Sequence, residues 1–244
     1  GYPQSEYLNE ACWGRKAKTQ LREWIQLKSF NYSEGNHDGY RFLEKPILHT
    51  RKIAFLNREY WIITDLLTGE GRHRFDLYFH LDCNPEELFF AGKNAYIKNE
   101  SLPGLVILPV LDSFNMRMER LNGWVSRFYN SRSPAPVLRY SKTMAAPAIL
   151  YTLIYPLEIK KKDEIKASFS NAKLRGRIIE PERAGFIEAR LSTGSDYYLV
   201  SHDSVCEKEY GPFIFNGKQA FIRCNHDSTF RKIILIGGNF LIYN

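Results

Sequence analysis

The chain is dominated by an alternation of apolar and polar positions with a period of two. In residues 75–81 the apolar side chains of Phe75, Leu77, Phe79 and Leu81 fall on one side of an extended chain, and polar side chains fall on the other. This pattern predicts a strand with one buried face. Residues 52–56 and 60–65 show similar patterns on either side of residues 57–59, which predicts a hairpin.

Two further hairpins are expected in the C-terminal third. Residues 213–222 contain the dipeptide Asn216-Gly217, which favours a tight hairpin turn because both residues readily take a positive φ. Residues 231–236 and 240–243 flank Gly237, Gly238 and Asn239, which predicts a second turn of the same kind.

Helical patterning is weak. Residues 17–27 and 182–190 each fit a short helix or a strand, and for the first we prefer a strand. Residues 160–164 carry three lysines and two acids with no apolar face, which indicates a solvated connection. Many short strands separated by turns predict an all-β fold: a large antiparallel β-sandwich of stacked, supersandwich-like sheets, with few or no helices.

Length and composition support a packed core. The chain has 244 residues, of which 44% are hydrophobic, and a protein of this size buries about three quarters of its surface. This excludes disordered, fibrous and disulfide-dependent classes. We expect residues 1–244 to form a single domain. The longest apolar runs, such as residues 233–236, are far shorter than the ~20 residues of a membrane span.

The charge favours acidic partners without choosing among them. Lys and Arg number 34 against 27 Asp and Glu, which gives a net charge of +7, and such a field attracts polyanionic sugars, nucleic acid or an anionic surface. No ribonucleoprotein aromatic signature and no helix-turn-helix pattern is present, so nucleic-acid binding is disfavoured. Four cysteines without a Cys-x-x-Cys pair indicate no disulfide framework and leave the redox compartment open.

The histidines give no catalytic or metal motif. His37, His202 and His226 each precede an aspartate, but neighbours in a strand point to opposite faces, so we expect polar residues at strand ends. Cys224 and His226 would share one strand face. A zinc site would need two more ligands, such as His202 and Cys206, and no characteristic spacing brings these in. We therefore assign no metal site to the chain.

Two basic clusters lie near aromatic side chains and are our candidates for contacting substrate or a further domain. They consist of Trp13, Arg15 and Lys16, and of Arg72 and Arg74, which would share one strand face. An aromatic ring stacks on the apolar face of a sugar, while a guanidinium group pairs with a carboxylate or sulfate. Solvated cations beside core aromatics are the alternative.

A series of stretches, taken in order, resembles the C-terminal β-sheet domain of the heparinase II/III-like polysaccharide lyases. The stretches are residues 4–6, 13–17, 37–41, 49–52, 60–65, 69–74, 79–81, 123–126, 135–140 and 152–156. Within them His73 and His80 match the family pattern, and we expect their ring nitrogens to bond to backbone within the sandwich.

The resemblance implies one half of a two-part enzyme. Members of that family combine an N-terminal α/α toroid with a C-terminal β-sandwich of stacked sheets, and they cleave acidic polysaccharides such as glycosaminoglycans by β-elimination. A base removes the C5 proton of a uronate while the 4-linked oxygen leaves. The adjacent carboxylate must be neutralised, and a Tyr or His must move protons.

The groups that perform this chemistry in the family are not found in this chain. The toroid supplies the carboxylate-neutralising residue and the catalytic Tyr, and the catalytic His and any zinc ligands lie in motifs just before the stretch that begins here. We therefore assign no catalytic residue, place any zinc in a longer parent, and expect this segment alone to be inactive.

The start of the chain reads like an internal cut in a longer parent, and we expect any leader to lie upstream of residue 1 in that parent. Because large acidic polymers are met outside the cytoplasm, the resemblance implies a periplasmic or secreted location. The expected partners are an acidic polysaccharide and the toroid of the same parent. The alternative function is a non-catalytic module of the same fold that binds acidic polysaccharide.

Overall fold

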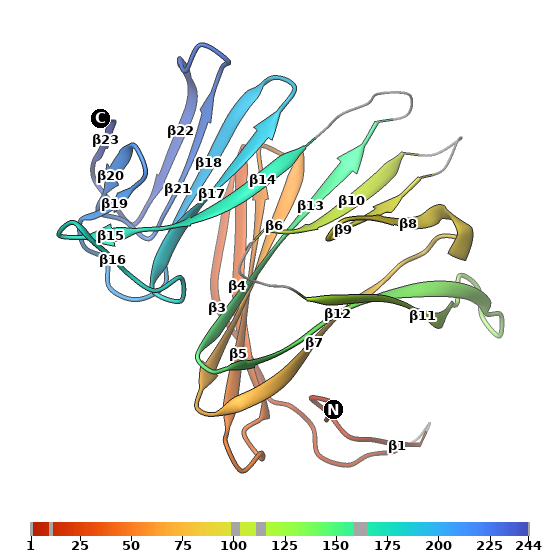
Figure 1. The fold of residues 1–244 in the computed structure, drawn as a ribbon. Coiled ribbons are helices and arrows are strands. Elements are labelled where there is room, and N and C mark those ends of the chain that lie inside the picture. Colours follow the sequence, from red (N-terminus) through yellow and green to blue (C-terminus); the bar gives the residue numbers. More distant parts are fainter. Residues whose placement is uncertain (1, 10–11, 99–102, 111–115, 159–164, 244) are drawn as a thin grey trace.

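The computed structural model describes residues 2–9, 12–98, 103–110, 116–158 and 165–243. The described residues are almost entirely β-structure, with one short 3-10 turn at Pro85–Glu87. Two short strands, β1 (Tyr7–Asn9) and β2 (Cys12–Trp13), pair in an N-terminal arm. The remaining strands form four antiparallel sheets that lie one on another (Figure 1). The predicted all-β class and stacked-sheet architecture are confirmed.

The large sheet has eight strands and forms the centre of the molecule. In spatial order its strands are β3 (Thr19–Leu27), β4 (Phe30–Tyr40), β5 (Ile47–Leu56), β6 (Tyr60–Gly69), β13 (Ala148–Leu157), β10 (Gly104–Pro109), β9 (Asn94–Ile97) and β8 (Leu88–Ala91). Residues far apart in sequence meet in it, because β13 enters between β6 and β10.

A three-stranded sheet covers part of one face of the large sheet. Its strands are, in order, β11 (Arg117–Val125), β12 (Ser133–Ala145) and β7 (Arg72–His80). Its buried side chains Leu77, Leu138 and Tyr140 pack with Ala95 and Ile107 of the large sheet. The alternation predicted for residues 75–81 is thereby confirmed.

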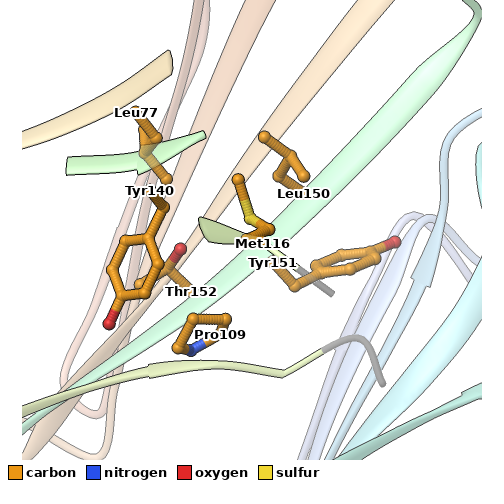
Figure 2. A pocket seen from close by; sticks show the side chains of 7 residues that line it. All are labelled: Leu77, Pro109, Met116, Tyr140, Leu150, Tyr151 and Thr152. Atoms are coloured by element: carbon orange, nitrogen blue, oxygen red, sulfur yellow. The ribbon is translucent and has the colours of Figure 1, made fainter. Parts of the chain in front are cut away.

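Side chains of β13 alternate between the two faces of the large sheet. Figure 2 shows Leu150 and Thr152 directed toward the three-stranded sheet, where Tyr140 lies, and Tyr151 directed the opposite way. The cavity that these side chains line together with Leu77 has a volume of about 10 Å³, enough for one water molecule at most. This interface is therefore packed core and not a ligand site.

Two further five-stranded sheets stack behind the other face of the large sheet. The first, called here the β18 sheet, has the order β14 (Lys166–Asn171), β17 (Ala184–Leu191), β18 (Gly194–Ser201), β21 (Gln219–Cys224), β22 (Phe230–Ile236). The second, the β20 sheet, has the order β16 (Arg177–Ile178), β15 (Lys173–Leu174), β19 (Lys208–Tyr210), β20 (Phe213–Phe215), β23 (Leu241–Tyr243).

A separate core lies on each side of the β18 sheet. Phe30, Leu56 and Ile149 of the large sheet pack with Tyr198 and Phe221 of the β18 sheet. On its other side, Phe213 and Phe215 of the β20 sheet pack with Ala220 and Ile222 of the β18 sheet. The β18 sheet is thus buried on both faces, in agreement with the burial of every residue of β21, the polar Gln219 and Arg223 included.

The predicted hairpin at residues 57–59 and the predicted strand in residues 17–27 are confirmed. The hairpin around residues 57–59 is present, with Leu56 paired to Tyr60 and positive φ at Asn57 and Arg58. Residues 19–27 form a strand, as preferred, and residues 184–191 also form one. The charged run at 160–164 lies outside the described residues.

The two expected C-terminal hairpins are wrong. Strands β20 and β21 belong to different sheets, as do β22 and β23, so residues 216–218 and 237–240 are crossovers between sheets. The Asn216 side chain joins the crossovers: its Oδ1 accepts from the amide of Asn239 at 3.1 Å and its Nδ2 donates to Asn239 Oδ1 at 2.6 Å. Burial of Phe213 and Phe215 between two sheets overrides the local preference of Asn-Gly.

Candidate functional site

The face of the large sheet that points away from the β18 sheet carries aromatic side chains on its first strands. The register places Trp24, Ser33, Ile53 and Ile63 in one row across β3–β6. In the next row the rings of Phe55 and Trp61 stack at 4.6 Å. Trp24 is 64% exposed and Leu21, on the same strand, is similarly exposed. We call this surface, defined by Leu21, Trp24, Ile53, Phe55 and Trp61, the open face.

A chain of hydrogen bonds borders the open face and ends on a buried carboxylate. The Gly39 amide donates to His37 Nδ1 at 3.2 Å, His37 Nε2 lies 2.9 Å from His49 Nδ1, and His49 Nε2 lies 2.6 Å from Asp65 Oδ1. Because a backbone amide only donates, His37 must carry its proton on Nε2 and His49 must do the same. Both rings are therefore neutral, and each ring nitrogen has a partner.

The surrounding charges agree with this assignment. Burial, followed by the neighbouring His49, lowers the pKa of His37 to about 4. Burial alone would raise the pKa of Asp65, but hydrogen bonds from His49 and Arg51 hold it below its ordinary value. Arg51 donates to both oxygens of Asp65, at 2.7 and 3.1 Å. This row of hydrogen bonds fixes β4, β5 and β6 to one another. It leaves no ring nitrogen of His37 or His49 free to bind a substrate or metal.

Another histidine lies between the large sheet and the β18 sheet. His202, which directly follows β18, has Lys52 Nζ 2.9 Å from its Nδ1 and the Tyr151 hydroxyl 2.7 Å from its Nε2. Burial and the adjacent Lys52 cation lower the pKa of His202 well below its ordinary value. Its place after a strand end was predicted, but the buried contact with residues 52 and 151 was not.

A buried ion pair within the β18 sheet is bonded to residues of the β5–β6 hairpin of the large sheet. Arg223 of β21 donates two bonds of 2.7 Å to the carboxylate of Asp196 and two more, of 2.7 and 2.8 Å, to Glu59. The Tyr60 hydroxyl donates to Asp196 Oδ2 at 2.8 Å. The three charged side chains and the Tyr60 hydroxyl all have hydrogen-bond partners, so this cluster is also structural.

The first predicted basic cluster lies in the N-terminal arm. The Arg15 guanidinium donates to the carbonyls of Pro3, Gln4 and Gly39 at 2.7–3.0 Å and lies 3.7 Å from the ring centroid of Phe42. Arg15 therefore attaches the arm to β4. Trp13 packs edge-on against Tyr7, and it and Lys16 are exposed.

The second predicted cluster lies on the outer face of the three-stranded sheet. Arg72 and Arg74 are exposed on β7, as their spacing predicts; Arg74 pairs with Asp76 at 3.1 Å, and Arg72 donates to the Thr143 carbonyl at 3.5 Å. The sheet adds a group that the sequence did not indicate: Glu119 pairs with both Arg117 and Arg139.

His73 bonds the Glu70 carbonyl at 2.8 Å, as expected for a histidine held by backbone. His80 is exposed on β7.

The residues considered for zinc have separate environments. Cys224 is buried in the core between the β18 and β20 sheets, His226 Nε2 lies 2.9 Å from the Ser192 carbonyl, and Cys206 Sγ contacts Ser204 Oγ at 3.6 Å. Among the described residues, no group of three or more His, Cys, Asp or Glu side chains is placed to hold a metal ion. In the same part of the chain, no helix has the length and apolar character needed to cross a bilayer.

These features are those of a stacked-sheet domain with exposed arginines on its outer sheet and with the rings of His37, His49 and His202 fully hydrogen-bonded. The chain belongs to the heparinase II/III-like C-terminal family, whose model matches residues 1–147. This agrees with the resemblance seen in the ordered sequence stretches.

An individual relative is similar in sequence over part of its length, and two solved structures share the fold. A heparin-sulfate lyase of Pedobacter heparinus is 24% identical over 119 residues, which are 48% of this chain and 18% of that protein. The crystal structure of the heparan sulfate lyase HepC from the same organism matches 76% of this chain and 28% of its own, with a TM-score of 0.63 and 17% identity. A crystal structure of heparinase III matches 75% and 27%, with a TM-score of 0.58 and 12% identity. The chain thus spans well under a third of these relatives.

Proposed function

We propose that this chain is the β-sandwich domain of a polysaccharide lyase that cleaves a uronate-containing acidic polysaccharide by β-elimination. The family match over residues 1–147 carries the proposal, because these residues build the three-stranded sheet and seven of the eight strands of the large sheet. The matching fold of HepC extends the likeness into the C-terminal sheets, since it covers 76% of the chain.

The chemistry that we propose needs groups beyond the described clusters. Elimination requires a donor that neutralises the uronate carboxylate and a side chain that takes the C5 proton. His37, His49 and His202 have both ring nitrogens occupied. We therefore place the bond-breaking groups on another part of the parent, and give this chain the roles of cleft wall and basic surface.

The exposed apolar surface of the open face is evidence that a second domain of the same parent packs there. Leu21 and Trp24 expose apolar surface on an otherwise packed sheet, and exposed apolar patches mark interaction sites. The relatives are more than three times as long as the matched region. We propose that the N-terminal helical toroid of the parent packs on this face, and that Arg72, Arg74, Trp13 and Lys16 lie at or near the sugar-binding side.

The test is an absorbance assay for the unsaturated uronate product, run on the 244-residue chain alone and on the full-length parent. We expect no product from the chain alone and product from the parent. In the parent, Trp24→Glu should lower activity by disrupting domain packing, whereas Arg190→Ala, at an exposed site on β17, should not. Product formation by the chain alone would contradict our placement of the reacting groups.

A non-catalytic module that binds acidic polysaccharide is the second candidate. The net charge of +7 and the occupied histidines favour it. It predicts salt-sensitive binding of acidic oligosaccharides by the chain and no product from the full-length parent. For either function we propose a periplasmic or secreted location, which cell fractionation followed by immunoblotting would test.

A further inference from the structure

The turn that joins β11 to β12 projects from the end of the three-stranded sheet (Figure 1). Two exposed aromatic rings lie in this turn and a third lies at the end of β11. Tyr129 is fully exposed, Phe128 is 75% exposed and Trp124 is 59% exposed. Burial of large aromatic side chains stabilises a fold, so leaving three neighbouring rings in water forgoes that stabilisation. Such a cluster marks a site that contacts something else.

The turn is held in a defined shape. The Ser126 hydroxyl donates to the Phe128 carbonyl at 3.0 Å, and the Ser131 amide donates to the same carbonyl at 3.2 Å. Arg127 Nε donates to Asp82 Oδ2 at 3.2 Å, which attaches the turn to the segment after β7. A turn fixed in this way loses little conformational entropy when its side chains bind a ligand.

A cation lies directly against the aromatic group. The Arg132 guanidinium carbon is 4.5 Å from the centroid of the Trp124 ring. Residues 124–132 contain two arginines and no acid, and Arg127 is already paired with Asp82. Arg132 is thus the charge available to a ligand. We call Trp124, Phe128, Tyr129 and Arg132 together the aromatic tip.

We propose that the aromatic tip is a binding site for an acidic oligosaccharide. The rings of Phe128 and Tyr129 offer flat apolar surfaces for the CH face of a sugar, and Arg132 pairs with a carboxylate or sulfate on it. Asn130 and Ser131, which lie in sequence between Tyr129 and Arg132, add hydrogen-bonding groups, which suits a sugar better than a lipid bilayer. The inference rests on the proposed function for its class of ligand and assigns that ligand to named residues.

The test measures affinity directly, separately from lyase activity. A heparan sulfate oligosaccharide of defined length is titrated calorimetrically into the 244-residue chain and its variants. Tyr129→Ala and Arg132→Ala should each weaken binding about tenfold, the loss typical of removing one anchor side chain. Tyr129→Phe should retain the affinity, because the ring is kept. Raising the salt concentration should weaken the unchanged protein more than Arg132→Ala.

Matched controls come from the opposite end of the molecule. Tyr243→Ala removes a half-exposed ring from β23 and Arg190→Ala removes an exposed cation from β17; both should bind as tightly as the unchanged chain. Thermal unfolding of the tip variants should match that of the unchanged protein, because the tip side chains are exposed.

Binding of the same variants to phosphatidylglycerol vesicles is measured in parallel. Three outcomes would overturn the inference: both tip variants bind the oligosaccharide as tightly as the unchanged chain, no variant binds the oligosaccharide at all, or the tip variants lose only their binding to the vesicles. If the parent forms product while the tip variants bind normally, the inference fails and the lyase function stands. If the tip variants lose binding while the parent forms no product, the inference stands and the lyase function fails.

Discussion

The two faces of the large sheet are packed by different physical means. Toward the three-stranded sheet the interface is apolar, formed by side chains such as Leu77, Leu138 and Ile107. Toward the β18 sheet, an apolar core is joined by buried polar groups that cross between the sheets, among them the Tyr60 hydroxyl bonded to Asp196 and Lys52 beside His202. Apolar packing is non-directional, whereas hydrogen bonds depend steeply on distance and angle. The difference indicates that polar contacts hold the β18 sheet in one specific position on the large sheet. The three-stranded sheet is held mainly by the apolar surface that it buries.

The largest expected effect tests the polar interface. Asp196→Ala leaves the buried Arg223 with only the half-exposed Glu59 and leaves the Tyr60 hydroxyl without its acceptor. Breaking a buried pair from one side costs about 3–5 kcal/mol of unfolding free energy. Denaturant unfolding measures this. Arg190→Ala, which removes an exposed pair with Glu188, should cost less than about 1 kcal/mol. Equal losses in the two variants would refute the assigned role of Asp196.

The apolar interface should respond to loss of volume. Leu138 is fully buried between the three-stranded and large sheets, so Leu138→Ala should cost about 2–5 kcal/mol through lost burial and a cavity. Trp24→Ala, on the exposed surface of the large sheet, should cost no more than about 0.5 kcal/mol in the isolated chain. Denaturant unfolding again gives both values. A cost for Trp24→Ala as large as that for Leu138→Ala would show that the open face is covered within this chain.

The smallest and most gradual effect concerns pH. His37 has a pKa of about 4 in the fold against 6.5 when unperturbed, and the pKa of His202 is also lowered. The unfolded chain therefore binds protons that the folded chain does not, so stability is complete above about pH 6.5 and falls as the pH drops toward 4. Unfolding measured across this range should show the decline, and His37→Gln should make it shallower. A stability that rises on acidification would contradict the neutral His37–His49 chain.

Local sequence pattern was sufficient for strands but not for sheets. The alternation in residues 75–81 and the turn at Asn57 and Arg58 depend on neighbours in the chain, and both were predicted correctly. Which sheet a strand joins depends on distant partners. Asn216-Gly217 favours a hairpin by itself, yet β20 pairs with β19 and β23 while β21 pairs with β18 and β22. The residues near Asn216 and Gly217 do not determine which sheet each strand joins.

The same limit applies to the candidate site. The shared face of Arg72 and Arg74 follows from a period of two, so sequence analysis found it. The addition of Glu119 and Arg139 to that surface depends on the register of β11 and β12. The contact between Lys52 and His202 joins residues 150 positions apart. Arg15 was selected for its charge, but its three backbone acceptors become apparent only once the arm is folded onto β4.

The position of β13 has a consequence for dividing this protein into pieces. The family match ends at residue 147, and β13 begins at the next residue. Shortening the chain to the matched region would remove the strand between β6 and β10 and split an eight-stranded sheet into fragments of four and three strands. Two long rows of unpaired amides and carbonyls would then face solvent, ready to pair with other molecules. A boundary drawn from sequence similarity alone would therefore produce an aggregating fragment, and a soluble one must continue at least through Leu157.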